Sequence, residues 1–208
     1  MKTFIYTTLL LFTGLIFAQG NYEKGMNKAF ELWGDGEMEE AQNMFERISN
    51  AEQDEWLPHY YIAQINSLKS WGEKNEAVLK AQLSKAQEHL DIAMNISENN
   101  PELLVMQAQV LTNWVAYDGM TYGMKYSGKI NQLYNKAVEL SPNNPRAVFN
   151  KADWEMNSAK YFGQDTKQLC SSIKASIGLF DEFEPKSDLH PNWGKERAEE
   201  VLESCKSE

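Results

Sequence analysis

Ten residues near the middle of the chain, NISENNPELL at positions 95–104, return as ELSPNNPRAV at positions 139–148. Their shared Asn-Asn-Pro core recurs 44 positions later, and the match continues outward to small residues such as Ala108 and Ala152. A fixed period with small residues at matched places is typical of stacked supersecondary units rather than of one globular core. The repeat therefore predicts an array of similar units.

Apolar residues follow helical spacing in almost every segment from 22 to 205, and the segments group into pairs. The expected units cover 22–55, 56–100, 101–144 and 145–188, and a last helix over 192–205 caps the array. The sequence thus predicts an all-α fold, a right-handed superhelix of about four helix-turn-helix hairpins plus the capping helix.

Residues at the expected helix contacts resemble the tetratricopeptide repeat (TPR) family. The small residue midway along the first helix of each unit is Ala29, Ala63, Ala108 and Ala152 in turn. The resemblance covers about 22–185, but the later units are about ten residues longer than the family repeat, and we expect the excess between the two helices of each unit. The pattern is also similar to small exported TPR proteins of Gram-negative bacteria, a resemblance that implies no activity.

The first 18 residues have the pattern of a secretory signal peptide. Lys2 precedes an apolar run over 4–17, and Ala18 is a small residue at the expected cleavage position. Cleavage would leave 19–208 as a single repeat domain, periplasmic or secreted. Ile16 meets the cleavage pattern only in part, which leaves an uncleaved anchor open. No later segment is apolar enough to cross a bilayer, so we expect no stable membrane insertion after cleavage.

The net charge limits the classes of partner that we expect, and the cysteine content bears on the cellular compartment. The chain carries 20 basic and 30 acidic residues, a net charge of −10, which argues against nucleic acid and anionic membrane surfaces as partners. The two cysteines are Cys170 and Cys205, and in an exported protein an even number favours a disulfide. Two separately buried thiols are the alternative.

Motifs for catalysis or for cofactor and metal binding are incomplete. Residues 123–129 fit G-x-x-x-x-G-K, but Ile130 stands where a phosphate loop needs Ser or Thr to hold Mg²⁺. The S-x-x-K match at 171–174 lacks the other elements of its chemistry. The three histidines show no metal-binding spacing. We therefore predict no catalytic residues, no metal, no cofactor and no enzymatic activity.

The most unusual stretch is the Gly/Tyr/Met-rich segment 117–128, which we interpret as a loop between two helices. Glycines there free the backbone, and tyrosines and methionines offer adaptable contact surface. A packed connector without a binding role is the alternative. The predicted partner-facing or ligand-facing residues are Trp114, Tyr117, Tyr122, Lys125, Tyr126, Trp154, Lys160 and Tyr161.

Two functions fit these features. The first is a non-enzymatic scaffold that holds a protein or peptide on the concave face of the array. The second is a small-ligand binding protein or enzyme with its site under the segment 117–128. Both use the same aromatic residues, so the sequence does not separate them.

Overall fold

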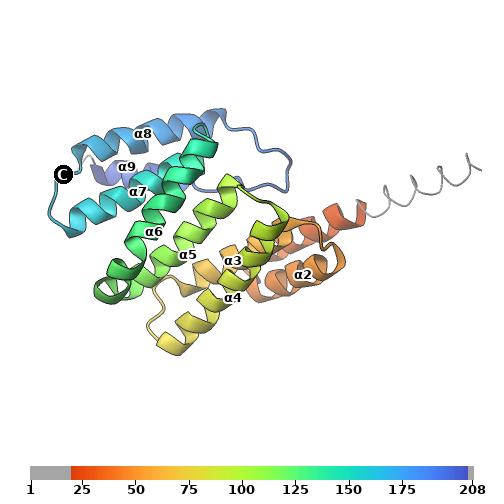
Figure 1. The fold of residues 1–208 in the computed structure, drawn as a ribbon. Helices are drawn as coiled ribbons and strands as arrows, with labels where there is room; N and C mark the ends of the chain where they lie inside the picture. Colours follow the sequence, from red (N-terminus) through yellow and green to blue (C-terminus); the bar gives the residue numbers. More distant parts are fainter. Residues whose placement is uncertain (1–19, 206–208) are drawn as a thin grey trace, which may run out of the picture.

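The structure, a computed structural model, describes residues 20–205. Every regular element in this range is an α-helix, which confirms the all-α prediction. A first helix covers residues 20–34. The later helices are α2 (Met38–Ala51), α3 (Trp56–Ser70), α4 (Glu76–Ile96), α5 (Pro101–Tyr117), α6 (Gly119–Leu140), α7 (Pro145–Tyr161), α8 (Lys167–Glu182) and α9 (Lys195–Cys205). Consecutive helices pack as hairpins, and α3, α5 and α7 also contact one another in order, an arrangement consistent with a TPR superhelix (Figure 1).

In two of the repeat units, the first helix begins at the repeated Asn-Pro pair. The side chain of Asn100 accepts a hydrogen bond from the backbone N–H of Glu102 at 3.0 Å, and Pro101 opens α5. Asn144 caps α7 in the same way, through the backbone N–H of Arg146 at 2.9 Å. Each cap satisfies N–H groups that lack an intrahelical partner, which stabilises a helix by about 1 kcal/mol.

Small residues lie where the helices approach most closely. The alanines that suggested the repeat are fully or almost fully buried, among them Ala63, Ala86, Ala108, Ala137 and Ala152. A larger side chain there would push neighbouring helices apart or leave its preferred rotamer. The repeat in the sequence thus reflects the spacing of the helices.

The prediction of a loop at 117–128 is wrong. Only Asp118 separates α5 from α6, and the glycine-rich stretch forms the first half of α6. Asp118 caps this helix by accepting from the backbone N–H groups of Met120 and Thr121 at 3.1 and 3.0 Å. The helix persists because its later turns bury Ile130 and Tyr134 against neighbouring helices, which outweighs a glycine cost of about 1 kcal/mol per residue.

Two further boundaries differ from expectation. The extra length of the second and third units lies inside long helices, α4 with 21 residues and α6 with 22, rather than between paired helices. The capping helix was expected from Asn192, but α9 begins at Lys195. Gly194 precedes it with a positive φ of 111°, a conformation that favours glycine and ends the extended segment before the helix.

Two features of the described residues concern export, namely a disulfide and the apolarity of the helices. Cys170, early in α8, and Cys205, at the end of α9, form a disulfide with a Cα–Cα distance of 6.0 Å. None of the helices among residues 20–205 is long and apolar enough to span a membrane. The predicted signal peptide lies outside the described residues.

Candidate functional site

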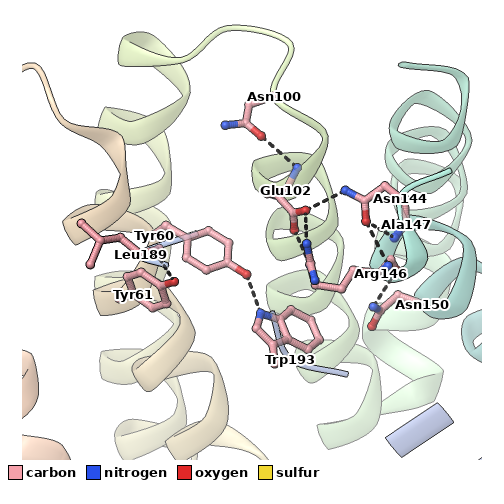
Figure 2. A network of polar contacts seen from close by, with 10 residues as sticks. All are labelled: Tyr60, Tyr61, Asn100, Glu102, Asn144, Arg146, Ala147, Asn150, Leu189 and Trp193. Carbon is pink, nitrogen blue, oxygen red and sulfur yellow. Dashed lines mark hydrogen bonds and ion pairs between the residues drawn. The ribbon is translucent and has the colours of Figure 1, made fainter. Parts of the chain in front are cut away.

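The inner face of the array, formed by α3, α5 and α7, is covered by the protein's own chain. The segment 183–194, here called the strap, joins α8 to α9 without helical structure and reaches back to α3. Tyr61 donates its phenolic hydrogen to the carbonyl oxygen of Leu189 at 2.7 Å, and the Trp193 indole N–H donates to the Tyr60 oxygen at 2.8 Å (Figure 2). Leu189 is buried within the core around α3.

A buried ion pair lies on the same face. Arg146 of α7 donates from Nε and Nη2 to the two carboxylate oxygens of Glu102 on α5, at 2.8 and 2.7 Å (Figure 2). Asn144 donates a third hydrogen bond to Glu102 at 2.6 Å. The ring of Phe183 in the strap lies 4.5 Å from the Arg146 guanidinium carbon, a cation–π contact.

Burial sets the protonation of this face. Arg146 is 1 % exposed, and Tyr60 is fully buried. Burial, reinforced by the nearby Glu102 carboxylate, raises the pKa of Tyr60 well above its usual range, so the phenol stays neutral. Most polar groups of the inner face bond to one another and to the strap, although Nη1 of Arg146 is buried without a hydrogen-bond partner. The face thus holds the array together and is covered by the strap in this conformation.

A different region is open to solvent. A hollow of about 420 Å³ lies between the α3–α4 turn and the end of α5. It is lined by Ser70, Trp71, Gly72, Glu73, Lys74, Asn113, Ala116 and Tyr117. Asn113 at its floor donates to the Ser67 carbonyl oxygen at 2.7 Å and to the Ser70 hydroxyl at 2.8 Å. The floor is thus a fixed polar patch, while Trp71 at the rim is 63 % exposed.

An aromatic ladder connects α5 with the first half of α6, and it begins at Trp114, one helical turn before Tyr117 of the hollow. The Trp114 ring lies 4.9 Å from the Tyr122 ring, and Tyr122 stacks on Tyr126 at 5.8 Å with nearly parallel planes. The Lys125 ammonium lies 4.9 Å from the centre of the Tyr126 ring. One helical turn separates the two tyrosines, so α6 itself sets their stacking.

Positive charge accompanies the ladder. In α6, Lys125, Lys129 and Lys136 precede its one acidic residue, Glu139, although the whole chain is strongly acidic. Lys74 lines the hollow. The region therefore offers flat aromatic surface with cationic side chains around it, which suits a planar apolar molecule with negative groups at its edge.

The structure brings together five of the eight predicted site residues: Trp114, Tyr117, Tyr122, Lys125 and Tyr126. It places the other three elsewhere. Trp154 on α7 donates its indole N–H to Asn131 of α6 at 2.7 Å. Lys160 and Tyr161 end α7, where Tyr161 contacts the neighbouring ring of Phe162 at 5.1 Å.

Sequence reasoning missed Trp71 and Asn113 as members of this region. One signal was present. Trp71 directly precedes a turn glycine, much as the predicted Tyr117 stands just before Gly119. Aromatic residues followed within two positions by glycine recur at the ends of α3, α5 and α7.

A pair of histidines forms a separate polar contact between α3 and α4. The Nδ1 atoms of His59 and His89 lie 2.8 Å apart, so one of them must donate and the other accept. Burial, with a smaller contribution from the adjacent His89, lowers the pKa of His59 to about 4, which keeps this contact neutral. Among the described residues no three His, Cys, Asp or Glu side chains gather as a metal site.

Comparison with known proteins identifies a fold and leaves the family open. The chain matches no family model and no curated protein sequence. Its structure is similar to that of the HusA haemophore from Porphyromonas gingivalis, with a TM-score of 0.78 over 89 % of this chain and 93 % of that chain. The two sequences are 21 % identical, so the likeness concerns the helical fold. The all-helical fold is consistent with the TPR resemblance, and no family model supports that resemblance.

Proposed function

We propose that the protein is an exported, non-enzymatic binding protein that holds a planar, largely apolar small molecule at the hollow beside Trp71 and Tyr117. The observation that carries the proposal is the half-buried aromatic ladder of Trp114, Tyr122 and Tyr126, which begins one helical turn before Tyr117, a residue that lines the hollow. Ligand sites usually have volumes of about 300–1,000 Å³. This hollow has a volume of about 420 Å³, and its lining combines the rings of Trp71 and Tyr117 with polar side chains.

The ligand class that we propose is haem or a related tetrapyrrole. Such molecules are flat, apolar over most of their surface and anionic at one edge, which matches the rings and the neighbouring Lys74 and Lys125. The similarity of the fold to a haemophore supports the choice, although that protein shares only 21 % of its residues with this one.

Binding is a better description than catalysis because the hydroxyl in the hollow is already engaged. Ser70 donates to the Ser67 carbonyl oxygen at 2.7 Å and accepts from Asn113 at 2.8 Å. A nucleophilic serine would instead need a base to take its proton. The strap also weakens the case for a peptide groove, because it already occupies part of the inner face where we expected a peptide to lie.

A titration of the purified mature chain with ferric haem tests this proposal. Binding is followed by the haem absorption band and by quenching of tryptophan fluorescence. We expect saturable binding that Trp71→Ala and Tyr122→Ala each weaken by about tenfold, the equivalent of 1.4 kcal/mol for a lost aromatic contact. Metal-free protoporphyrin, run in parallel, separates contact with the ring from ligation of the iron.

Tyr161→Ala is the matched control. It also removes an exposed aromatic residue, but at the next turn along the array, outside the hollow. It should leave haem affinity unchanged. Absence of saturable binding, or an equal loss in all three variants, would contradict the proposal.

A further inference from the structure

The most exposed large apolar side chains of the described chain all lie at or next to one kind of helix junction. The five that are more than 60 % exposed are Trp71, Met120, Met124, Tyr161 and Phe162. Trp71, Tyr161 and Phe162 lie at the connections from α3 to α4 and from α7 to α8, and Met120 and Met124 lie in the first two turns of α6, which follows α5 directly. We call the three segments 68–80, 117–129 and 158–167 the turn edge.

The repeat explains why these turns form a row. Each hairpin stacks on the one before it, so the turn inside one hairpin lies next to the corresponding turn of its neighbour. Figure 1 shows the ends of α3, α5 and α7 along one side of the molecule, at the lower left and left, opposite the strap. The exposed apolar side chains are therefore collected on one edge.

The charge of this edge is opposite to that of the whole protein. The three segments contain seven lysines and four acidic residues, whereas the complete chain has a net charge of −10. Charges further away than a Debye length of about 8 Å are largely screened at physiological salt, so a surface that touches the edge experiences mainly the charges of the edge itself, in which lysines outnumber acidic residues.

We propose that the turn edge docks the protein on an anionic phospholipid surface. Trp71, Met120, Met124 and Phe162 enter the headgroup region, and lysines such as Lys69, Lys129 and Lys160 lie at the level of the phosphates. Exposed aromatic residues flanked by lysine suit a membrane–water interface. Their rings contact the apolar part of the lipid, and the lysine ammonium groups stay hydrated beside the anionic headgroups. A row of turns also presents projecting side chains to a flat surface, which a concave face does not.

Docking in this way would bring the mouth of the hollow to the lipid, because Trp71 belongs to both. The two proposals nevertheless depend in part on different residues, because each site has members that the other lacks. Tyr161 and Phe162 contribute to the edge alone, and Tyr122 contributes to the aromatic ladder. Haem binding and lipid binding can thus fail separately.

Flotation with lipid vesicles tests the inference. The mature chain is mixed with vesicles of phosphatidylcholine alone or of phosphatidylcholine with phosphatidylglycerol. We expect binding to the anionic vesicles only, reduced about tenfold by the double variant Tyr161→Ser/Phe162→Ser, because apolar burial at the interface is lost. Lys125→Glu/Lys129→Glu should reduce it by at least as much, with high salt acting in the same direction.

Ile92→Ser/Leu140→Ser is the matched control, since both residues are exposed and apolar but lie outside the turn edge. It should bind vesicles like the unmodified chain, and Tyr161→Ser/Phe162→Ser should bind haem like the unmodified chain. Equal binding to neutral vesicles, no binding to anionic ones, or an equal loss in the control would overturn the inference. A dimer in solution that the edge variant dissociates would also overturn it and assign the edge to a second copy of the chain.

Discussion

The inner face and the turn edge are both rich in aromatic residues, but their surroundings are opposite. On the inner face Tyr60 and Tyr61 are buried and bonded to the strap. At the turn edge Trp71 and Phe162 are 63 % and 71 % exposed. Aromatic composition alone therefore does not mark a binding surface in a helical array. What distinguishes the two regions is whether another part of the chain covers them.

The largest expected effect tests whether the inner face is structural. Glu102→Ala leaves Arg146 buried without its carboxylate, and breaking such a pair costs about 3–5 kcal/mol. The midpoint of thermal unfolding should fall by roughly 10 °C for a domain of this size. Glu31→Ala, which breaks the exposed Lys28–Glu31 pair, should cost less than about 1 kcal/mol. Similar losses of stability in the two variants would contradict a structural role for the inner face.

The strap should contribute the next largest effect. Leu189→Ala removes a buried side chain from the core around α3, which typically costs about 2–4 kcal/mol. Hydrogen exchange of the strap should also accelerate, because its attachment to α3 is weakened. Lys186→Ala, at an exposed position of the strap, provides the comparison. Unchanged stability in Leu189→Ala would mean that the strap only rests on the inner face.

Acid should destabilise the protein through the buried histidine contact between α3 and α4. The folded-state pKa of His59 is about 4, below the ordinary value of 6.5, so the unfolded chain binds more protons between these values. The stability from this neutral contact is present above about pH 6.5 and is lost as the pH falls toward 4, with a change of about 1–3 kcal/mol. Urea midpoints measured across this range should show the loss.

His59→Gln is the variant for this experiment, because it keeps a polar side chain but removes the titrating group. Its urea midpoint should depend less steeply on pH than that of the unmodified chain. The three segments of the turn edge contain no histidine, so their variants should retain the full pH dependence. A slope that is unchanged in His59→Gln would assign the acid sensitivity to another group.

The smallest expected effects belong to the turn edge. Trp71→Ala and Phe162→Ala should each change the free energy of unfolding by no more than about 0.5 kcal/mol, because these side chains are largely solvated. Chemical unfolding of the same preparations used for haem and vesicle binding checks this. A cost of several kcal/mol would show that the edge is held by packing, and the contrast with the inner face would disappear.

Local signals predicted much of the fold. Asn100-Pro101 and Asn144-Pro145 marked the starts of α5 and α7, because a capping side chain and a proline without an N–H both suit a first helical turn. The spacing of small residues marked the contacts between helices. These features act within a few residues or repeat regularly, so a single sequence displays them.

The errors arose where distant contacts override local preference. Gly123 and Gly128 suggested a loop, yet nothing lies within 4 Å of a Cβ built at either, so they permit the helix without being required by a close approach. Packing of α6 on α5 decided the conformation. The strap has no periodic pattern, and its partner Tyr61 is 128 residues away from Leu189, so the covered inner face could not be foreseen.

For the candidate site, the sequence identified the aromatic ladder but not its surroundings. Tyr122 and Tyr126 are close in sequence and share one helix, so their association was predictable. The hollow itself needs Trp71 and Asn113, which come from two different hairpins. Only the stacking of those hairpins brings the two residues together.

The disulfide between Cys170 and Cys205 gives the strap a further property. The strap lies within the 35-residue interval that this bond closes, so α8, strap and α9 form a covalent ring. A single cut by a protease at an exposed strap residue such as Lys186 would open the ring without releasing a fragment. Under oxidising conditions a nicked molecule would gain only the mass of one water and keep its α8–α9 pair, so separate fragments would appear only after reduction.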